Sequence, residues 1–162
     1  MRLFAGSSHP ALAQAIADGL QIELSKADLK KFSSGECYVR FLESVRGKEV
    51  YILQTATQTT NEALIELFLM CQAAKLSFAQ SVHVILPHFP YARQDRVAEP
   101  REPISAKLIA HLLEESGADH VMTFDLHSAQ IQGFFSIPVD SLDARQVFAE
   151  YFAQKKLKLS LI

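Results

Sequence analysis

Residues 82–96 read VHVILPHFPYARQDR, and this stretch carries the strongest signal for both fold and site. Its first five residues are apolar or nearly so, and Pro87 follows soon after them, which is typical of a buried strand in a parallel sheet. The next segment, from Pro87 to Pro103, is long for a strand-to-helix connection and has four prolines but no glycine. Ligands of parallel sheets bind where strands end. The pattern therefore predicts a binding loop after this strand.

The loop has the chemistry of a phosphate site. Arg93 and Arg96 are permanently charged, and the planar guanidinium of Arg93 can bind two phosphate oxygens at once. Gln94 offers both a donor and an acceptor. The alternative is a surface loop whose charges pair with one another, namely Arg93, Asp95, Arg96, Glu99 and Arg101. The position at a strand end favours the binding interpretation.

A second strand end carries complementary groups. The apolar run from His120 to Phe124 leads into Asp125, Leu126, His127 and Ser128. A lone histidine at a strand end is more often structural, but a neighbouring arginine loop favours His127 as a ligand of a phosphate-bound divalent cation. The sequence contains no GxxxxGK[ST] motif, which argues against a P-loop ATPase.

Residues 3–5 are predicted to form the first strand, and Gly6, Ser7 and Ser8 the turn after it. Pro10 is expected at the start of a helix capped by Ser8 or His9 and striped by Leu12, Ile16 and Leu20. The turn could cradle phosphate through its N–H groups, but an ordinary strand-to-helix turn is the favoured interpretation.

Residues 29–53 indicate strands separated by turns at 33–35 and 46–47, with antiparallel pairing attached to the parallel sheet. Phe32 lies next to the first turn. It either packs on Tyr38 at the rim or offers a flat surface to an aromatic ligand, and periodicity does not decide between the two.

Three further helices are predicted. The first begins with a capping box formed by Thr59 and Glu62. Its core stripe consists of Leu64, Leu67, Phe68, Cys71 and Ala74. Its other faces are also apolar and are expected to be covered by a subunit interface or a second layer, at Ile65, Leu69 and Met70. The second begins at Pro103, has the stripe Ile104, Leu108 and Leu112, and ends at Gly117. The third is capped by Asp143 and striped by Ala144, Val147, Phe148, Tyr151 and Phe152. Alternation from Lys158 to Ile162 indicates an incomplete strand, so Ile162 is not expected to be the natural end.

The composition is that of an ordinary globular protein. The 162 residues are 49% hydrophobic and 21% charged with a net charge of -2, which gives no general attraction for nucleic acid. Cys37 and Cys71 lack metal-ligand spacing and are predicted to be buried, reduced thiols. Neither a signal peptide nor a membrane span is indicated, so a cytoplasmic protein without a membrane partner is expected.

Seven segments together resemble the ribose-phosphate pyrophosphokinase (phosphoribosyl pyrophosphate synthetase) family. They are RLFAG at 2–6, KFSSGE at 31–36, SVRG at 44–47, FPYARQDR at 89–96, REPISAK at 101–107, DLHSAQIQGFF at 125–135 and PVD at 138–140. The resemblance implies an α/β fold of phosphoribosyltransferase type, a parallel sheet with flanking helices plus an antiparallel strand flap. It also implies an N-terminal ATP-side domain at 1–141 and the beginning of a second, similar domain at 142–162.

The resemblance further implies the reaction. The family transfers the diphosphoryl group of ATP to ribose 5-phosphate with Mg²⁺, giving phosphoribosyl pyrophosphate (PRPP) and AMP, and assembles from dimers into a homohexamer. A non-catalytic associated subunit of the same family is the alternative, although retention of Arg93, Gln94 and His127 favours the enzyme.

The resemblance assigns roles to individual residues. Phe32, Ser34, Gly35 and Glu36 look like an ATP-binding loop that reaches a neighbouring subunit, Arg93, Gln94 and Arg96 look like further ATP contacts, and His127 looks like the magnesium ligand. Asp125 looks like a residue that orients its loop. Catalytic and ribose-phosphate groups are expected beyond Ile162. Ser34 stands where the family usually has aspartate, and Val97, Glu99 and Pro100 interrupt a usually basic segment.

Overall fold

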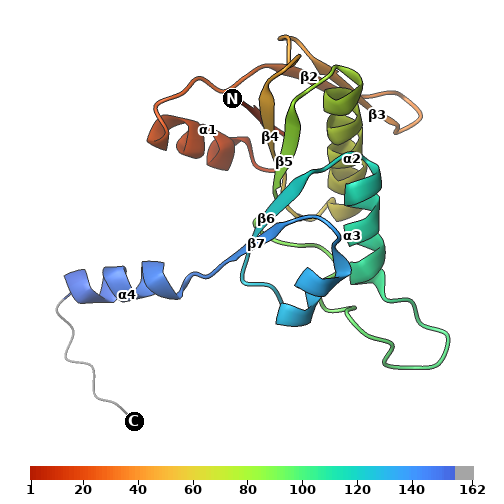
Figure 1. The fold of residues 1–162 in the computed structure, drawn as a ribbon, viewed down its shortest axis with the longest axis vertical. Coiled ribbons are helices and arrows are strands. Elements are labelled where there is room, and N and C mark those ends of the chain that lie inside the picture. Colours follow the sequence, from red (N-terminus) through yellow and green to blue (C-terminus); the bar gives the residue numbers. More distant parts are fainter. Residues whose placement is uncertain (156–162) are drawn as a thin grey trace.

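Five short parallel strands form the central sheet of the computed structural model, which describes residues 1–155 (Figure 1). The elements in chain order are β1 (Arg2–Ala5), α1 (Pro10–Gly19), β2 (Ala27–Lys31), β3 (Cys37–Phe41), β4 (Glu49–Leu53), α2 (Thr60–Leu76), β5 (Ser81–Ile85), α3 (Ser105–Glu115), β6 (His120–Phe124), the 3₁₀ helix η1 (Ala129–Phe134), β7 (Val139–Leu142) and α4 (Arg145–Gln154). The strand order is β1-β4-β5-β6-β7, and every neighbouring pair is parallel. The predicted α/β fold class is confirmed.

Helices α2 and α3 cover one face of the sheet, and α1 lies on the other (Figure 1). Because strand side chains alternate between faces, Val50, Ile52, Val82 and Val84 point into the core with α2. On the α1 face, Leu3 and Leu53 are fully buried. Coverage of that face is incomplete near β6 and β7, where Phe124 is 40% and Leu142 is 45% exposed.

The predicted apolar stripe of α3 is wrong, and that of α1 holds only in part, because Leu12 and Ile16 are half-buried but Leu20 is exposed. In α1, Ala13 and Ala17 are buried whereas Leu20 is 56% exposed, because small residues let the helix approach the sheet closely. In α3, the buried positions are Ala106, Ile109, Ala110 and Leu113, and Leu108 and Leu112 face solvent. The helix also begins at Ser105 rather than Pro103. The predicted cap on α1 is confirmed, because His9 Nδ1 accepts a hydrogen bond from Leu12 N.

Helix α2 has the predicted stripe but not the predicted capping box. Thr59 occupies the N-cap position without a side-chain cap bond, and Glu62 pairs instead with Lys31 of β2. Met70, which was predicted to be covered by a subunit interface or a second layer, is fully buried, because the 17-residue helix packs against both the sheet and the hairpin. Ile65 and Leu69, which were predicted to be covered in the same way, are exposed within this chain.

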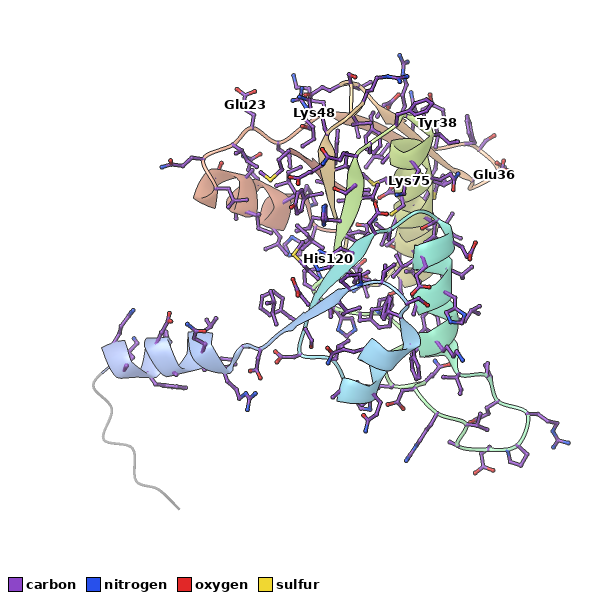
Figure 2. The ribbon with its side chains drawn as sticks, viewed as in Figure 1. Glu23, Glu36, Tyr38, Lys48, Lys75 and His120 are labelled. Atoms are coloured by element: carbon purple, nitrogen blue, oxygen red, sulfur yellow. The ribbon has the colours of Figure 1, made fainter. Side chains whose placement is uncertain are left out.

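Strands β2 and β3 form a separate antiparallel hairpin rather than an extension of the sheet's ladder. A single bridge between Phe4 and Ser25 and a ring contact between Phe4 and Phe41, with centroids 4.2 Å apart, hold it against the sheet. Gly35, with φ +89°, makes the turn. Figure 2 shows Glu36 at the exposed tip of this hairpin.

Helix α4 projects away from the sheet (Figure 1), and among the described residues none of its side chains is buried. Its predicted stripe is exposed, from Phe152 at 41% to Val147 at 62%. The predicted Asp143 cap is displaced by one residue: Ala144 occupies the N-cap position without a side-chain cap bond, and Asp143 Oδ1 accepts a hydrogen bond from Arg145 N at 2.7 Å from just before it. The alternating segment predicted at 158–162 lies outside the described residues.

Cys71 is buried, as predicted, whereas Cys37 is only half-buried on the hairpin, so the prediction is wrong for Cys37. Both are free thiols. Burial raises the pKa of Cys71 to about 12, which keeps it protonated at neutral pH. Across residues 1–155, no helix has the length and apolarity needed to cross a bilayer.

Candidate functional site

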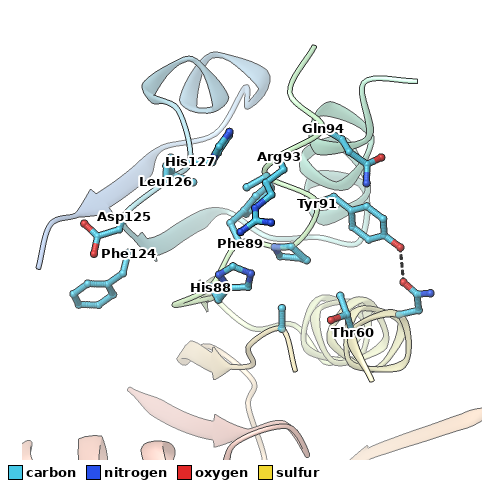
Figure 3. Close-up of a pocket in the computed structure, with 14 residues that line it drawn as sticks. Thr60, His88, Phe89, Tyr91, Arg93, Gln94, Phe124, Asp125, Leu126 and His127 are labelled. Atoms are coloured by element: carbon cyan, nitrogen blue, oxygen red, sulfur yellow. Dashed lines mark hydrogen bonds between the residues drawn. The ribbon is translucent and has the colours of Figure 1, made fainter. Parts of the chain in front are cut away.

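The predicted strand ends meet at one edge of the sheet. β5 and β6 are paired in parallel, and two hydrogen bonds continue the pairing beyond them, from Leu86 N to Met122 O and from Phe124 N to Pro87 O. A pocket of about 530 Å³ opens there, within the size range of small-molecule sites (Figure 3). It is lined by Ala56, Thr60, Asn61, residues 88–94 and residues 124–127.

Arg93 lines this pocket with an exposed guanidinium. Among the ion pairs of residues 1–155, none joins Arg93, Arg96 or Arg101 to a carboxylate, so the alternative of a self-paired surface loop is wrong. Arg93 is therefore available to an anion. Arg96 is exposed and lies outside the pocket lining.

The arginine loop is anchored at several points. Tyr91 adopts φ +59° and donates its hydroxyl to Asn61 Oδ1 at 2.5 Å, which ties the loop to the start of α2 (Figure 3). Gln94 Oε1 accepts from Ser105 Oγ at 2.6 Å, and Gln94 O accepts from Ala106 N, so the loop is joined to α3. The NH₂ group of Gln94 remains as a donor towards a ligand.

Asp95 connects the two strand ends. Its carboxylate accepts a hydrogen bond from Ser128 Oγ at 2.6 Å. That bond is the main reason that the pKa of Asp95 lies below its ordinary value, and the nearby His127 and Arg96 lower it further. The loop that carries Arg93 is thereby held beside the loop that carries His127.

Replacing Ser128 with alanine is expected to raise the pKa of Asp95 towards its ordinary value of about 3.9. Because the pKa of Asp95 is lower in the folded state than in the unfolded state, the Ser128–Asp95 bond stabilises the fold at pH values above the unfolded-state pKa. That stabilisation is lost as the pH falls through the folded-state pKa. A carboxyl NMR titration of both proteins measures the shift. Asp143, whose pKa is lowered by Arg145, is the internal control and is expected to stay unchanged. An unaltered Asp95 titration would contradict the assignment.

His127 is exposed and lines the pocket, whereas Asp125 points away from Arg93 (Figure 3). Asp125 Oδ1 lies 3.4 Å from Ala144 N, and Asp125 N donates to Leu142 O, so this residue joins its loop to β7 and α4. Within residues 1–155, no three His, Cys, Asp or Glu side chains gather as a metal cage. His127 alone suits an ion such as Mg²⁺ that is held mainly by phosphate and water.

The turn after β1 is an ordinary turn, as favoured from the sequence. Its N–H groups already have protein acceptors, because Ser7 N donates to Glu66 Oε1 at 2.7 Å and Ser8 N donates to Gln54 Oε1 at 3.1 Å. These amides are therefore not available to phosphate.

The hairpin residues predicted to contact ATP lie outside the pocket lining. Phe32 is 55% exposed and makes an edge contact with Tyr38, with ring centroids 5.8 Å apart, so it both packs at the rim and leaves a face open. Ser34 Oγ donates to Glu36 Oε2 at 2.5 Å.

Sequence patterns missed several pocket residues, including Thr60, Asn61, His88 and Phe124. Of these, only His88 could have been predicted as a pocket residue from the sequence, because it directly follows Pro87 at the end of a predicted strand. The contributions of Thr60 and Asn61 depend on how α2 begins beside the loop, and no local pattern reports that.

Fold and site together define an α/β ligand-binding domain whose pocket, at the carboxyl ends of parallel strands, is equipped for anions. Residues 1–117 match the family described as the N-terminal domain of ribose phosphate pyrophosphokinase. The chain belongs to the ribose-phosphate pyrophosphokinase family.

Two curated relatives illustrate the match. Ribose-phosphate pyrophosphokinase 1 of Streptococcus pneumoniae is 48% identical over 155 residues, covering 96% of this chain and 48% of the relative. Ribose-phosphate pyrophosphokinase of Wolinella succinogenes is 48% identical over 161 residues, covering 99% of this chain and 52% of the relative. The chain thus spans about half the length of these relatives.

A solved structure, phosphoribosylpyrophosphate synthetase from Mycobacterium smegmatis, superposes with a TM-score of 0.92 at 43% identity, covering 94% of this chain and 51% of that one. The predicted phosphoribosyltransferase-like fold is confirmed.

Proposed function

We propose that this chain supplies the ATP-binding half of a ribose-phosphate pyrophosphokinase. The full-length protein would transfer the β,γ-diphosphoryl group of ATP to the anomeric hydroxyl of ribose 5-phosphate, giving PRPP and AMP. The observation that carries the proposal is a pocket lined by Arg93 from one strand end, which has no carboxylate partner among residues 1–155, and by His127 from the next. Phosphoryl transfer depends on such positioning and charge stabilisation.

The pocket side chains have distinct roles in this proposal. Arg93 pairs with phosphate oxygens, and the NH₂ group of Gln94 donates to the phosphate or ribose side of ATP. Arg96, outside the lining, acts at most through its charge. His127 contributes one protein ligand to Mg²⁺, which when bound neutralises charge on the triphosphate.

The hairpin is proposed to act in trans. Phe32, Ser34, Gly35 and Glu36 would reach the adenine side of the pocket in a neighbouring subunit of a homo-oligomer built from dimers into a hexamer. The exposure of Phe32, and the fact that none of these four residues lines this chain's own pocket, support that arrangement.

We place ribose 5-phosphate binding and the remaining catalytic groups in the half of the relatives that this chain does not match. Residues 142–162 would begin the second domain, a proposal supported by the absence of buried side chains in α4 of the described chain. The 162-residue chain alone is expected to bind ATP without completing the transfer. The cytoplasm is the proposed location.

The decisive assay follows the products of the full-length protein given ATP, ribose 5-phosphate and Mg²⁺. AMP and PRPP are expected in equal amounts, measured by chromatography and ³¹P NMR. Formation of ADP and a ribose bisphosphate would contradict diphosphoryl transfer. Absence of any turnover, with ATP binding retained, would favour the non-catalytic subunit.

Replacing His127 with alanine is expected to raise the Mg²⁺ concentration needed for half-maximal activity by about tenfold, since a ligand worth about 1.4 kcal/mol corresponds to that factor. The measurement is the initial rate against Mg²⁺ at fixed ATP. His111→Ala, which changes an exposed histidine of α3, is the matched control. An unchanged Mg²⁺ dependence in His127→Ala would make this histidine structural.

A further inference from the structure

A row of polar side chains crosses the half-covered face of the sheet, away from the ATP pocket. Ser81 and His83 come from β5, His120 from β6 and Asp140 from β7. Ser81 Oγ lies 2.9 Å from His83 Nε2, the two Nδ1 atoms of His83 and His120 lie 3.2 Å apart, and His120 Nε2 lies 3.1 Å from Asp140 Oδ2. Strand register places the two histidines directly opposite each other.

The outer partners determine where the protons lie. The Asp140 carboxylate only accepts, so Nε2 of His120 carries a proton and Nδ1 of neutral His120 presents a lone pair. Nδ1–H of His83 then donates to that lone pair, and Nε2 of His83 accepts from Ser81. Moving the His83 proton to Nε2, where Ser81 Oγ can accept it, would leave two Nδ1 lone pairs side by side without releasing a proton.

That alternative arrangement matches the geometry of a metal site. Two nitrogens each about 2.0–2.1 Å from a tetrahedral Zn²⁺ lie about 3.3–3.4 Å apart, close to the 3.2 Å observed. Histidine ligands of metals usually donate their other N–H to a carboxylate or another oxygen, as His120 does to Asp140 and His83 would to Ser81.

We propose that His83 and His120 together bind a divalent transition-metal ion such as Zn²⁺ through their Nδ1 atoms, with water in the remaining positions. Imidazole suits Zn²⁺, Cu²⁺ and Ni²⁺, whereas Mg²⁺ prefers oxygen, so this site differs in selectivity from that at His127.

Surrounding charge and access support the site. Glu49 and Asp119 act on His83 as negative charges, and Asp140 adds a third next to His120. The charge of Lys75 is paired with Asp119. The His120 side chain is 19% exposed, so part of the ring is in contact with solvent. Tyr51 stacks on His83, with ring planes 12° apart, and holds that ring in place.

To test metal binding, bound metal is first removed from the full-length protein with a chelator. Zn²⁺ is then titrated into this protein in the presence of excess Mg²⁺, and its binding is measured by calorimetry. His83→Asn and His120→Asn are each expected to weaken Zn²⁺ binding by more than 100-fold. Asp140→Asn is expected to weaken it by about tenfold, the lower end of outer-partner effects. His111→Asn, on the surface of α3, is expected to bind as the unaltered protein does.

A second measurement does not depend on the variants folding. In ¹⁵N NMR of the unaltered protein, His83 is expected as the Nδ1–H tautomer without Zn²⁺, and both histidines as Nε2–H tautomers with metal-bound Nδ1 once Zn²⁺ is added. Zn²⁺ that leaves both Nδ1 resonances unchanged, or binding lost equally in His111→Asn, would show that the pair only shares a proton and would overturn the proposal.

Discussion

Replacing Arg93 with alanine is expected to weaken Mg-ATP binding by about 10–100-fold, the largest functional effect among single changes in the pocket. Hydrogen bonds to charged groups contribute about 1.5–3 kcal/mol, and Arg93 has no competing carboxylate among the ion pairs of residues 1–155. Calorimetry with Mg-ATP and the KM for ATP of the full-length protein both measure the loss.

Two further variants make this result interpretable. Arg93→Lys retains the charge but not the planar pair of donors, so an intermediate affinity is expected. Arg101→Ala removes a charge from the same loop outside the pocket lining, and ATP affinity is expected to change less than twofold. Equal losses in Arg93→Ala and Arg101→Ala would mean that general charge, rather than a placed guanidinium, binds the phosphate.

Replacing Gly6 with alanine is expected to lower the free energy of unfolding by about 2–4 kcal/mol. A Cβ at Gly6 would lie 2.5 Å from Gln54 Cδ and 2.6 Å from both amide heteroatoms. Gln54 cannot easily move, because it is 1% exposed and donates to Glu66 Oε1 at 2.7 Å and to Ala63 O at 3.2 Å. Thermal unfolding should show a Tm lower by roughly 5–15 °C.

Gly19→Ala is the matched control, since a Cβ at this end of α1 would meet no atom within 4 Å. Its unfolding free energy is expected to stay within about 1 kcal/mol, with any change towards greater stability, because alanine favours helix over glycine. Similar destabilisation in both variants would mean that loss of glycine itself, rather than the clash with Gln54, is responsible.

Local patterns predicted β5 and β6 well because each is a short apolar run with a clear boundary, whereas the strand β7 was not predicted. The run at 82–86 and that at 120–124 correspond to β5 and β6, and parallel pairing brings Arg93 and His127 to one pocket. Residues that follow parallel strands can be placed from the sequence, because the carboxyl ends of parallel strands lie at the same edge of the sheet.

The helix faces were predicted less well, because α1 and α3 each carry two sets of apolar residues at helical spacing. Periodicity alone cannot choose between Leu108 and Ile109, and the observed choice follows from which set fits the sheet. The capping box at Thr59 failed for a similar reason, since Lys31 of the hairpin engages Glu62.

By itself, the sequence determined the strand ends, the arginine loop and the family motifs, because these depend on contiguous residues. Only the tertiary structure showed that Ser128 holds Asp95, that Asn61 holds Tyr91, and that the turn after β1 is already satisfied by Gln54 and Glu66. It alone placed His83 opposite His120. Each of these contacts joins residues distant in sequence, and their meeting depends on how the strands pair and the helices pack.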